Sequence, residues 1–100
     1  MKWLTIAIMM AGCGASQRQL EHQAKVSRSD AERIALSRAP NGTVQHSELE
    51  RENGKLVWSF DIARHGSSDI TEVQVDAVTG EIASVEAETP AQEQQELQRQ

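Results

Sequence analysis

The sequence has one cysteine, three aromatic residues and fewer basic than acidic side chains, and each scarcity excludes a class of protein. One cysteine cannot form an internal disulfide, and three histidines without a second cysteine do not make a zinc framework. A net charge of -5 has the wrong sign for neutralising phosphates. A chain of 100 residues holds at most one small domain, with little room for a deep catalytic cleft. We therefore expect no nucleic-acid partner, no metal or other cofactor, and no enzyme activity.

The first twelve residues have the composition of a secretory leader. Lys2 supplies one positive charge, and an apolar run follows it and ends in small residues. The run is shorter than the ~20 apolar residues that a helix needs to cross a bilayer. We therefore predict a signal peptide over residues 1–12 and export from the cytoplasm.

Residues 10–13, Met-Ala-Gly-Cys, resemble the lipobox of bacterial lipoproteins, in which small residues precede a cysteine that is lipidated. Met10 stands where a branched aliphatic residue is usual, and the alternative is ordinary cleavage after Ala15. Lipidation is favoured because an unpaired thiol in an oxidising compartment is a liability unless it is capped. The resemblance implies a membrane anchor at Cys13. Gly14, in place of an aspartate that retains lipoproteins at the inner membrane, implies an outer-membrane lipoprotein on the periplasmic side of the envelope.

Two polar segments flank the part of the chain that has a folding pattern. Residues 13–25 contain one large apolar side chain, Leu20, and residues 87–100 are rich in Gln and Glu and also contain one, Leu97. Segments with so little apolar surface do not offset their own ordering entropy. We therefore predict a flexible tether over 13–25, a domain over 26–86 and a polar tail over 87–100.

A helix is expected at the start of that domain. Ser27 is the predicted N-cap with Asp30 at N3, and Ser29 with Glu32 is the competing cap. Pro40 ends the helix because it lacks an N–H and disfavours helical geometry at the preceding residue. The apolar positions at helical spacing are Ala31, Ile34, Ala35 and Ala39.

After Gly42 the hydrophobic period changes to two, which is typical of strands. Strands are expected over 43–51, 56–63, 70–76 and 81–85, with a bulge in the first and a type I′ turn at Asn53-Gly54. The fold class is therefore α+β, with one N-terminal helix packed on an antiparallel meander of three to four strands. The predicted core residues are Ile34, Leu49, Trp58, Phe60, Ile62, Val73, Val75 and Ile82.

Asp76, Ala77, Thr79 and Gly80 form the predicted turn between the last two strands. The Asp76 carboxylate is suited to accept backbone N–H groups two or more residues ahead, and Gly80 is suited to the left-handed conformation that closes such a turn. A catalytic or metal-binding role for Asp76 is the alternative, but no histidine, cysteine or paired acid stands at ligand spacing. We interpret these four residues as structural.

Several segments together resemble the PepSY domain over residues 25–85. They are Val26-Ser27, the helix over 31–39, residues 49–58 and above all residues 73–82, Val-Gln-Val-Asp-Ala-Val-Thr-Gly-Glu-Ile. The PepSY domain occurs in propeptides of thermolysin-type metalloproteases, in membrane proteins and in small exported proteins. The resemblance implies a non-catalytic module that binds or restrains peptidases and other partners, and it carries over no catalytic residue.

Other polar residues do not form a catalytic pattern. The three histidines, His22, His46 and His65, lie in different predicted segments and are interpreted as solvated or structural. Glu48, Glu50 and Glu52 alternate along one strand. They are interpreted either as an acidic stripe that recognises a basic partner or as a solvated face.

Three functions from different classes remain. The one we favour is an exported, lipid-anchored interaction module whose open sheet edge or helix-free face binds an extended segment of an envelope or secreted protein. The second is an inhibitor or modulator of a secreted peptidase acting in trans. The third is a structural envelope lipoprotein without a specific ligand.

Overall fold

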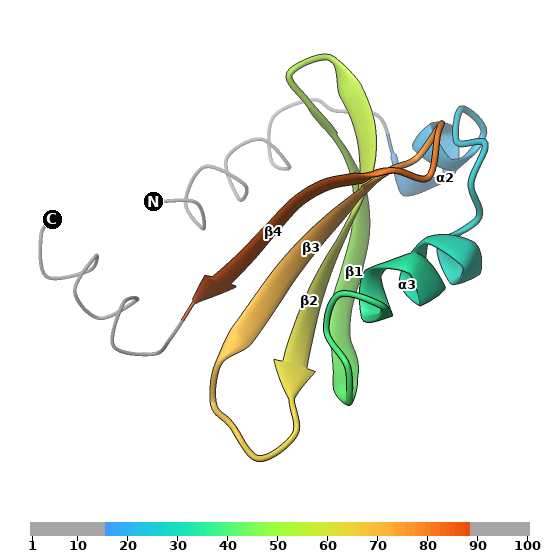
Figure 1. Cartoon of the computed structure of the whole chain (residues 1–100). Helices are drawn as coiled ribbons and strands as arrows, with labels where there is room; N and C mark the ends of the chain where they lie inside the picture. Colours follow the sequence, from blue (N-terminus) through green and yellow to red (C-terminus); the bar gives the residue numbers. More distant parts are fainter. Residues whose placement is uncertain (1–15, 89–100) are drawn as a thin grey trace, which may run out of the picture.

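The computed structural model describes residues 16–88, which form two helices and one four-stranded antiparallel sheet (Figure 1). The predicted α+β fold is confirmed. The predicted signal peptide, Cys13 and residues 89–100 of the tail lie outside the described residues. The elements are α2 (Gln17–Glu21), α3 (Arg28–Leu36), β1 (Gly42–Glu52), β2 (Lys55–Arg64), β3 (Ile70–Asp76) and β4 (Ile82–Glu88).

The longer helix, α3, begins at the predicted cap. The Ser27 hydroxyl accepts the backbone N–H of Asp30 at 3.1 Å, so Ser27 rather than Ser29 caps the helix. Ala31 and Ala35 are completely buried, and their small size brings the helix close to the sheet. The chain then enters β1 at Gly42, where a Cβ atom would collide with the Ile62 side chain.

The sheet is a simple meander with the order β1-β2-β3-β4. Its first turn has the predicted geometry, since Asn53 and Gly54 both have positive φ, 52° and 82°. The predicted bulge in β1 is confirmed by a register shift between Val44 and His46. A second shift lies in the β3–β4 pairing, between Gln74 and Val75. Strand β4 ends at Glu88, three residues beyond the predicted strand and two beyond the predicted domain.

The core lies between α3 and one face of the sheet. Its largest fully buried side chains are Phe60, Leu49, Ile62, Val73 and Val75. Trp58 is 3% exposed, stacks near Phe60 with ring centroids 6.5 Å apart, and donates its Nε1–H to the Val26 carbonyl at 2.9 Å. Ile34 and Ile82, also predicted as core, are partly buried and pack against this cluster.

The prediction of a flexible tether is wrong for residues 16–25, which contain the helix α2. Ser16 and Gln19 form a capping box at the start of α2, and Leu20 is buried in the core. The N–H groups of Lys25 and Val26 both donate to the Ala77 carbonyl. The polar composition suggested that the conformational entropy lost on ordering would keep this segment flexible. Burial of Leu20 and these hydrogen bonds offset that loss.

Replacing Trp58 by alanine should unfold the domain or nearly so. The substitution leaves a cavity at the centre of the core and removes the hydrogen bond to Val26, so we expect a loss of about 3 to 5 kcal/mol, close to the whole stability of a small domain. The measurement is urea unfolding followed by circular dichroism, with the half-exposed Val78→Ala as control. A Trp58→Ala protein that unfolds at the same urea concentration as the parent would contradict this account of the core.

Candidate interaction site

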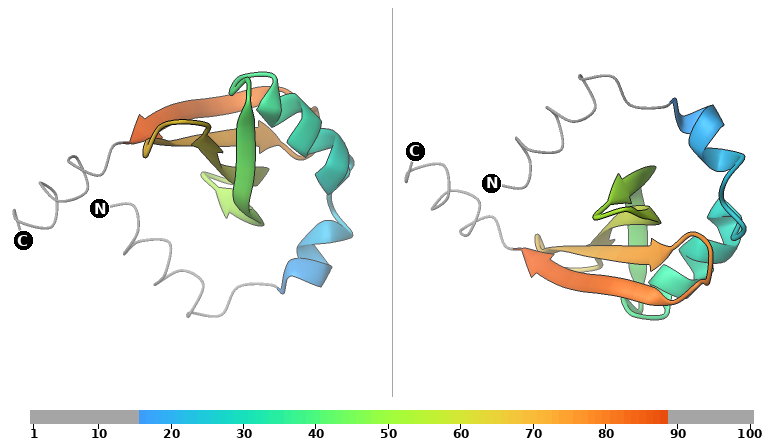
Figure 2. Two further views of the ribbon diagram at one scale, coloured as in Figure 1. Left: turned by 90° about the horizontal axis from the view of Figure 1, so that it is seen from below. Right: turned by 90° about the horizontal axis from the view of Figure 1, so that it is seen from above.

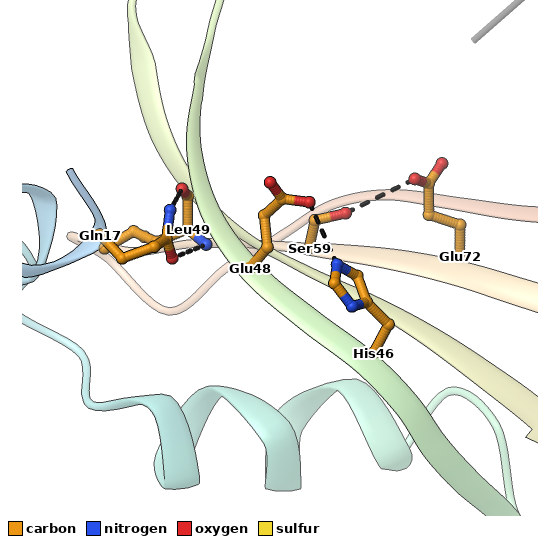
Figure 3. A network of polar contacts seen from close by, with 6 residues as sticks. All are labelled: Gln17, His46, Glu48, Leu49, Ser59 and Glu72. Atoms are coloured by element: carbon orange, nitrogen blue, oxygen red, sulfur yellow. Dashed lines mark hydrogen bonds and ion pairs between the residues drawn. The ribbon is translucent and has the colours of Figure 1, made fainter. Parts of the chain in front are cut away.

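The outer edge of β1 is occupied by a side chain of α2. Gln17 donates through Nε2 to the Leu49 carbonyl at 2.6 Å and accepts the Leu49 N–H through Oε1 at 2.9 Å (Figure 3). A primary amide offers the same donor and acceptor as a peptide group, so Gln17 takes the place of a neighbouring strand at this point. Sequence reasoning missed this contact, because a glutamine in a polar segment carries no pattern that identifies a partner 32 residues away.

The opposite edge of the sheet has no such contact among residues 16–88. Strand β4 pairs with β3 on one side, and no other described strand lies beyond it (Figure 1). Helix α2 packs mainly against β1 and α3 packs across β1, β2 and β3, and Figure 2 shows both helices at the end of the sheet where β3 turns into β4. An unpaired edge presents a row of backbone N–H and C=O groups suited to pairing with another chain.

Acidic side chains gather on the face of the sheet opposite α3, here called the acidic face. The strand register identifies the residues of each strand that lie on this face, because directly paired residues point to the same side of the sheet. The carboxyl side chains on this face are Glu48, Glu50 and Glu52 of β1, Asp61 of β2, Glu72 and Asp76 of β3 and Glu86 of β4. The basic residues placed there by the register are His46 and Lys55.

Hydrogen bonds link side chains across the acidic face. Glu52 accepts from Gln74 at 3.2 Å, and Gln74 in turn accepts from Ser84 at 3.0 Å, so polar contacts reach from β1 to β4. Figure 3 shows two further contacts, His46 with Glu48 at 3.3 Å and Ser59 with Glu72 at 3.5 Å.

The crowding of carboxylates on β1 changes the acidity of Glu50. Burial, a hydrogen bond with Glu52 and the charges of Glu48, Glu52 and Glu72 together raise the pKa of Glu50 to about 8. Glu50 therefore keeps its proton to a higher pH than an exposed glutamate does. The three β1 glutamates, which the sequence left open as an acidic stripe for a basic partner or a solvated face, form a partly buried, mutually repelling group.

The predicted turn residues act on the backbone. Asp76 accepts the N–H groups of Val78 at 2.8 Å and Thr79 at 3.0 Å, and these bonds lower the pKa of its carboxyl. Gly80 has a φ of 83° and donates its N–H to the Asp76 carbonyl. Ala77 is completely buried, and its N–H donates to the Leu56 carbonyl at 2.9 Å. These contacts support the structural interpretation of the turn.

The remaining polar candidates do not come together. His22 and His65 are exposed and lie apart from the His46–Glu48 pair. Across the part of the chain that the structure describes, no three His, Cys, Asp or Glu side chains form a group able to hold a metal ion. Neither α2 nor α3 has the length and apolar character that crossing a bilayer requires.

The raised pKa of Glu50 predicts that the domain loses stability as the pH rises. The unfolded chain releases the Glu50 proton near pH 4.5, whereas the folded chain keeps it until about pH 8, so the free energy of unfolding falls between these values. Glu50→Gln should remove this part of the pH dependence and melt at a higher temperature than the parent at pH 8. Thermal unfolding from pH 5 to pH 8 measures both effects.

The matched control for this prediction is Glu21→Gln, which removes an exposed carboxylate on α2, away from the acidic face. It should keep the pH slope of the parent. A Glu50→Gln protein with the parent's slope would show that Glu50 ionises normally in the folded state.

Comparison with known proteins identifies the domain. The PepSY family model, described as Peptidase propeptide and YPEB domain, matches residues 25–86, the segment that contains α3 and the whole meander except its last two residues. No curated protein and no solved structure gave a significant match. The match spans more than half of the chain, so this protein belongs to the PepSY family.

Proposed function

We propose that this protein is a non-catalytic, exported interaction module that binds an extended segment of a partner protein along β4. The observation that carries the proposal is the difference between the two sheet edges. Gln17 occupies β1, whereas β4 has no described neighbour beyond β3. A partner strand added at β4 gains backbone hydrogen bonds without breaking any within residues 16–88.

The composition of β4 supports this choice of edge. Natural sheets protect exposed edges with proline, with inward-pointing charges and above all with lysine. The β4 sequence, Ile-Ala-Ser-Val-Glu-Ala-Glu, contains neither proline nor lysine. Its bulge lies at the start of the strand, so residues 84–88 keep a regular register with β3. This regular part offers the longer stretch for pairing.

A second candidate function is inhibition or modulation of a secreted peptidase in trans. The family match favours it, because the family description names peptidase propeptides. Both candidates use the same edge and differ in the identity of the partner. The third possibility, a structural envelope protein without a specific ligand, predicts no preferred contact at β4.

Photocrosslinking in the native cell distinguishes these possibilities. A photoreactive residue at Val85 of β4 should give one discrete protein adduct, and the same residue at the exposed Thr43 of β1 should give none. Mass spectrometry then identifies the partner, and a peptidase would favour the second candidate. Equal adducts from both edges, or none from Val85, would contradict binding along β4.

We further propose that Cys13 carries a lipid anchor, with the protein on the periplasmic side of the outer membrane. The lipobox-like residues 10–13 support this proposal. The chains of a lipoprotein bury methylenes worth ~0.8 kcal/mol each, and several chains give stable attachment.

Intact mass of the protein purified from its native membrane tests the anchor. We expect a chain that begins at Cys13 and carries acyl groups, and we expect the Cys13→Ser variant to lack them and to leave the membrane fraction. An unmodified chain beginning at Ser16 would instead identify a freely secreted module and would favour the trans-acting inhibitor.

A further inference from the structure

We infer that the β4 edge selects a partner segment in which apolar side chains alternate with lysine or arginine. The inference rests on the proposed function, since it assigns a sequence pattern to the strand that β4 would bind. It follows from the chemistry of the two faces of β4, which differ sharply from each other.

The register of β4 assigns its side chains to the two faces. Val85 pairs with the core residue Val73 and therefore points to the α3 side of the sheet. Ser84 and Glu86 pair with Gln74 and Glu72 and therefore point to the acidic face. A strand added beside β4 obeys the same alternation, so its successive side chains meet two different surfaces.

The α3 side of β4 offers an apolar surface. Ile82 packs against the core and remains partly exposed, Val85 is 42% exposed, and Ala87 is exposed. Val85 and Val78 are the two large hydrophobic residues left exposed among residues 16–88. Apolar side chains of an added strand would extend the core over this edge and remove Val85 from water.

The other side of β4 offers negative charge. Glu86 lies directly opposite Glu72, and like charges in a cross-strand pair destabilise the sheet. Asp61 lies opposite Glu72 on its other side, so three carboxylates follow one another across β2, β3 and β4. A lysine or arginine from an added strand would bring positive charge beside Glu86, at the outer end of this row.

The charge balance of the acidic face favours the same kind of partner. Besides Glu50, whose pKa is raised, six carboxylates share this face with His46 and Lys55. Lys55 lies at the first turn, beside the end of β1. An acidic segment would meet repulsion there, and a purely apolar segment would leave half of its side chains against charged groups. Among extended segments, the alternating basic one matches both faces.

Synthetic eight-residue peptides with blocked ends test this inference on the full mature chain. The probes are an alternating Val-Lys peptide, an alternating Val-Glu peptide, and a block peptide with the valines and lysines separated. Binding is followed by amide chemical shifts in the NMR spectrum of the protein. We expect only the Val-Lys peptide to bind with shifts along β4, and we expect about 1 M salt to weaken it, because the Debye length falls to about 3 Å.

Matched protein variants separate local contact from overall charge. Glu86→Gln should weaken the Val-Lys peptide by roughly two- to five-fold, the range of an exposed ion pair, whereas Glu21→Gln removes the same charge from α2 and should change little. Peptides N-methylated at alternate positions add a test of strand pairing. Methylating the residues whose N–H groups would face β4 should abolish binding. Methylating the alternate residues, whose N–H groups would point away from β4, should leave binding intact.

The outcomes distinguish the two levels of the proposal. Equal binding of all three peptides along β4 would overturn the inferred pattern and leave strand addition intact. If the Val-Lys peptide shifted only the amide signals of β1, or if neither pattern of alternate N-methylation weakened its binding, strand addition at β4 would be overturned as well. No binding along β4 by any peptide would overturn both.

Discussion

The backbone of Ala77 joins the parts of the domain that lie far apart in the sequence, and the rest of the structure depends on this junction. Its N–H donates to the Leu56 carbonyl, and its carbonyl accepts from both Lys25 and Val26. The Val26 carbonyl in turn accepts the Trp58 Nε1–H, which closes the circuit back to β2. Because Ala77 is completely buried, its N–H and carbonyl groups are shielded from competing water.

This junction determines which edge of the sheet is free. By holding Lys25 and Val26 against the end of β3, it directs the preceding helix α2 to the outer side of β1 (Figure 1). Gln17 then reaches Leu49 and occupies that edge. This contact caps the outer edge of β1 at Leu49, whereas no contact of this kind is seen at the outer edge of β4 within residues 16–88.

The acidic face carries a cost in stability. Burial and neighbouring carboxylates raise the pKa of Glu50, which means that the folded chain holds a proton that the unfolded chain would release. Packing of the core does not explain why these glutamates cluster, since Glu48, Glu50 and Glu52 lie on the side of the sheet away from α3.

The sequence alone determined α3, the four strands and most of the core, because these depend on local chemistry and on periodicity. Ser27 and Pro40 bound the helix region, Asn53-Gly54 specifies the first turn, and the alternation around Trp58 identifies the buried face of β2. Only the tertiary structure decided the state of residues 16–25 and of the sheet edges. Gln17 and Leu20 acquire their roles from partners that lie more than twenty residues away, and no local pattern encodes that proximity. The pKa of Glu50 depends likewise on a carboxylate from β3, which the register alone brings near.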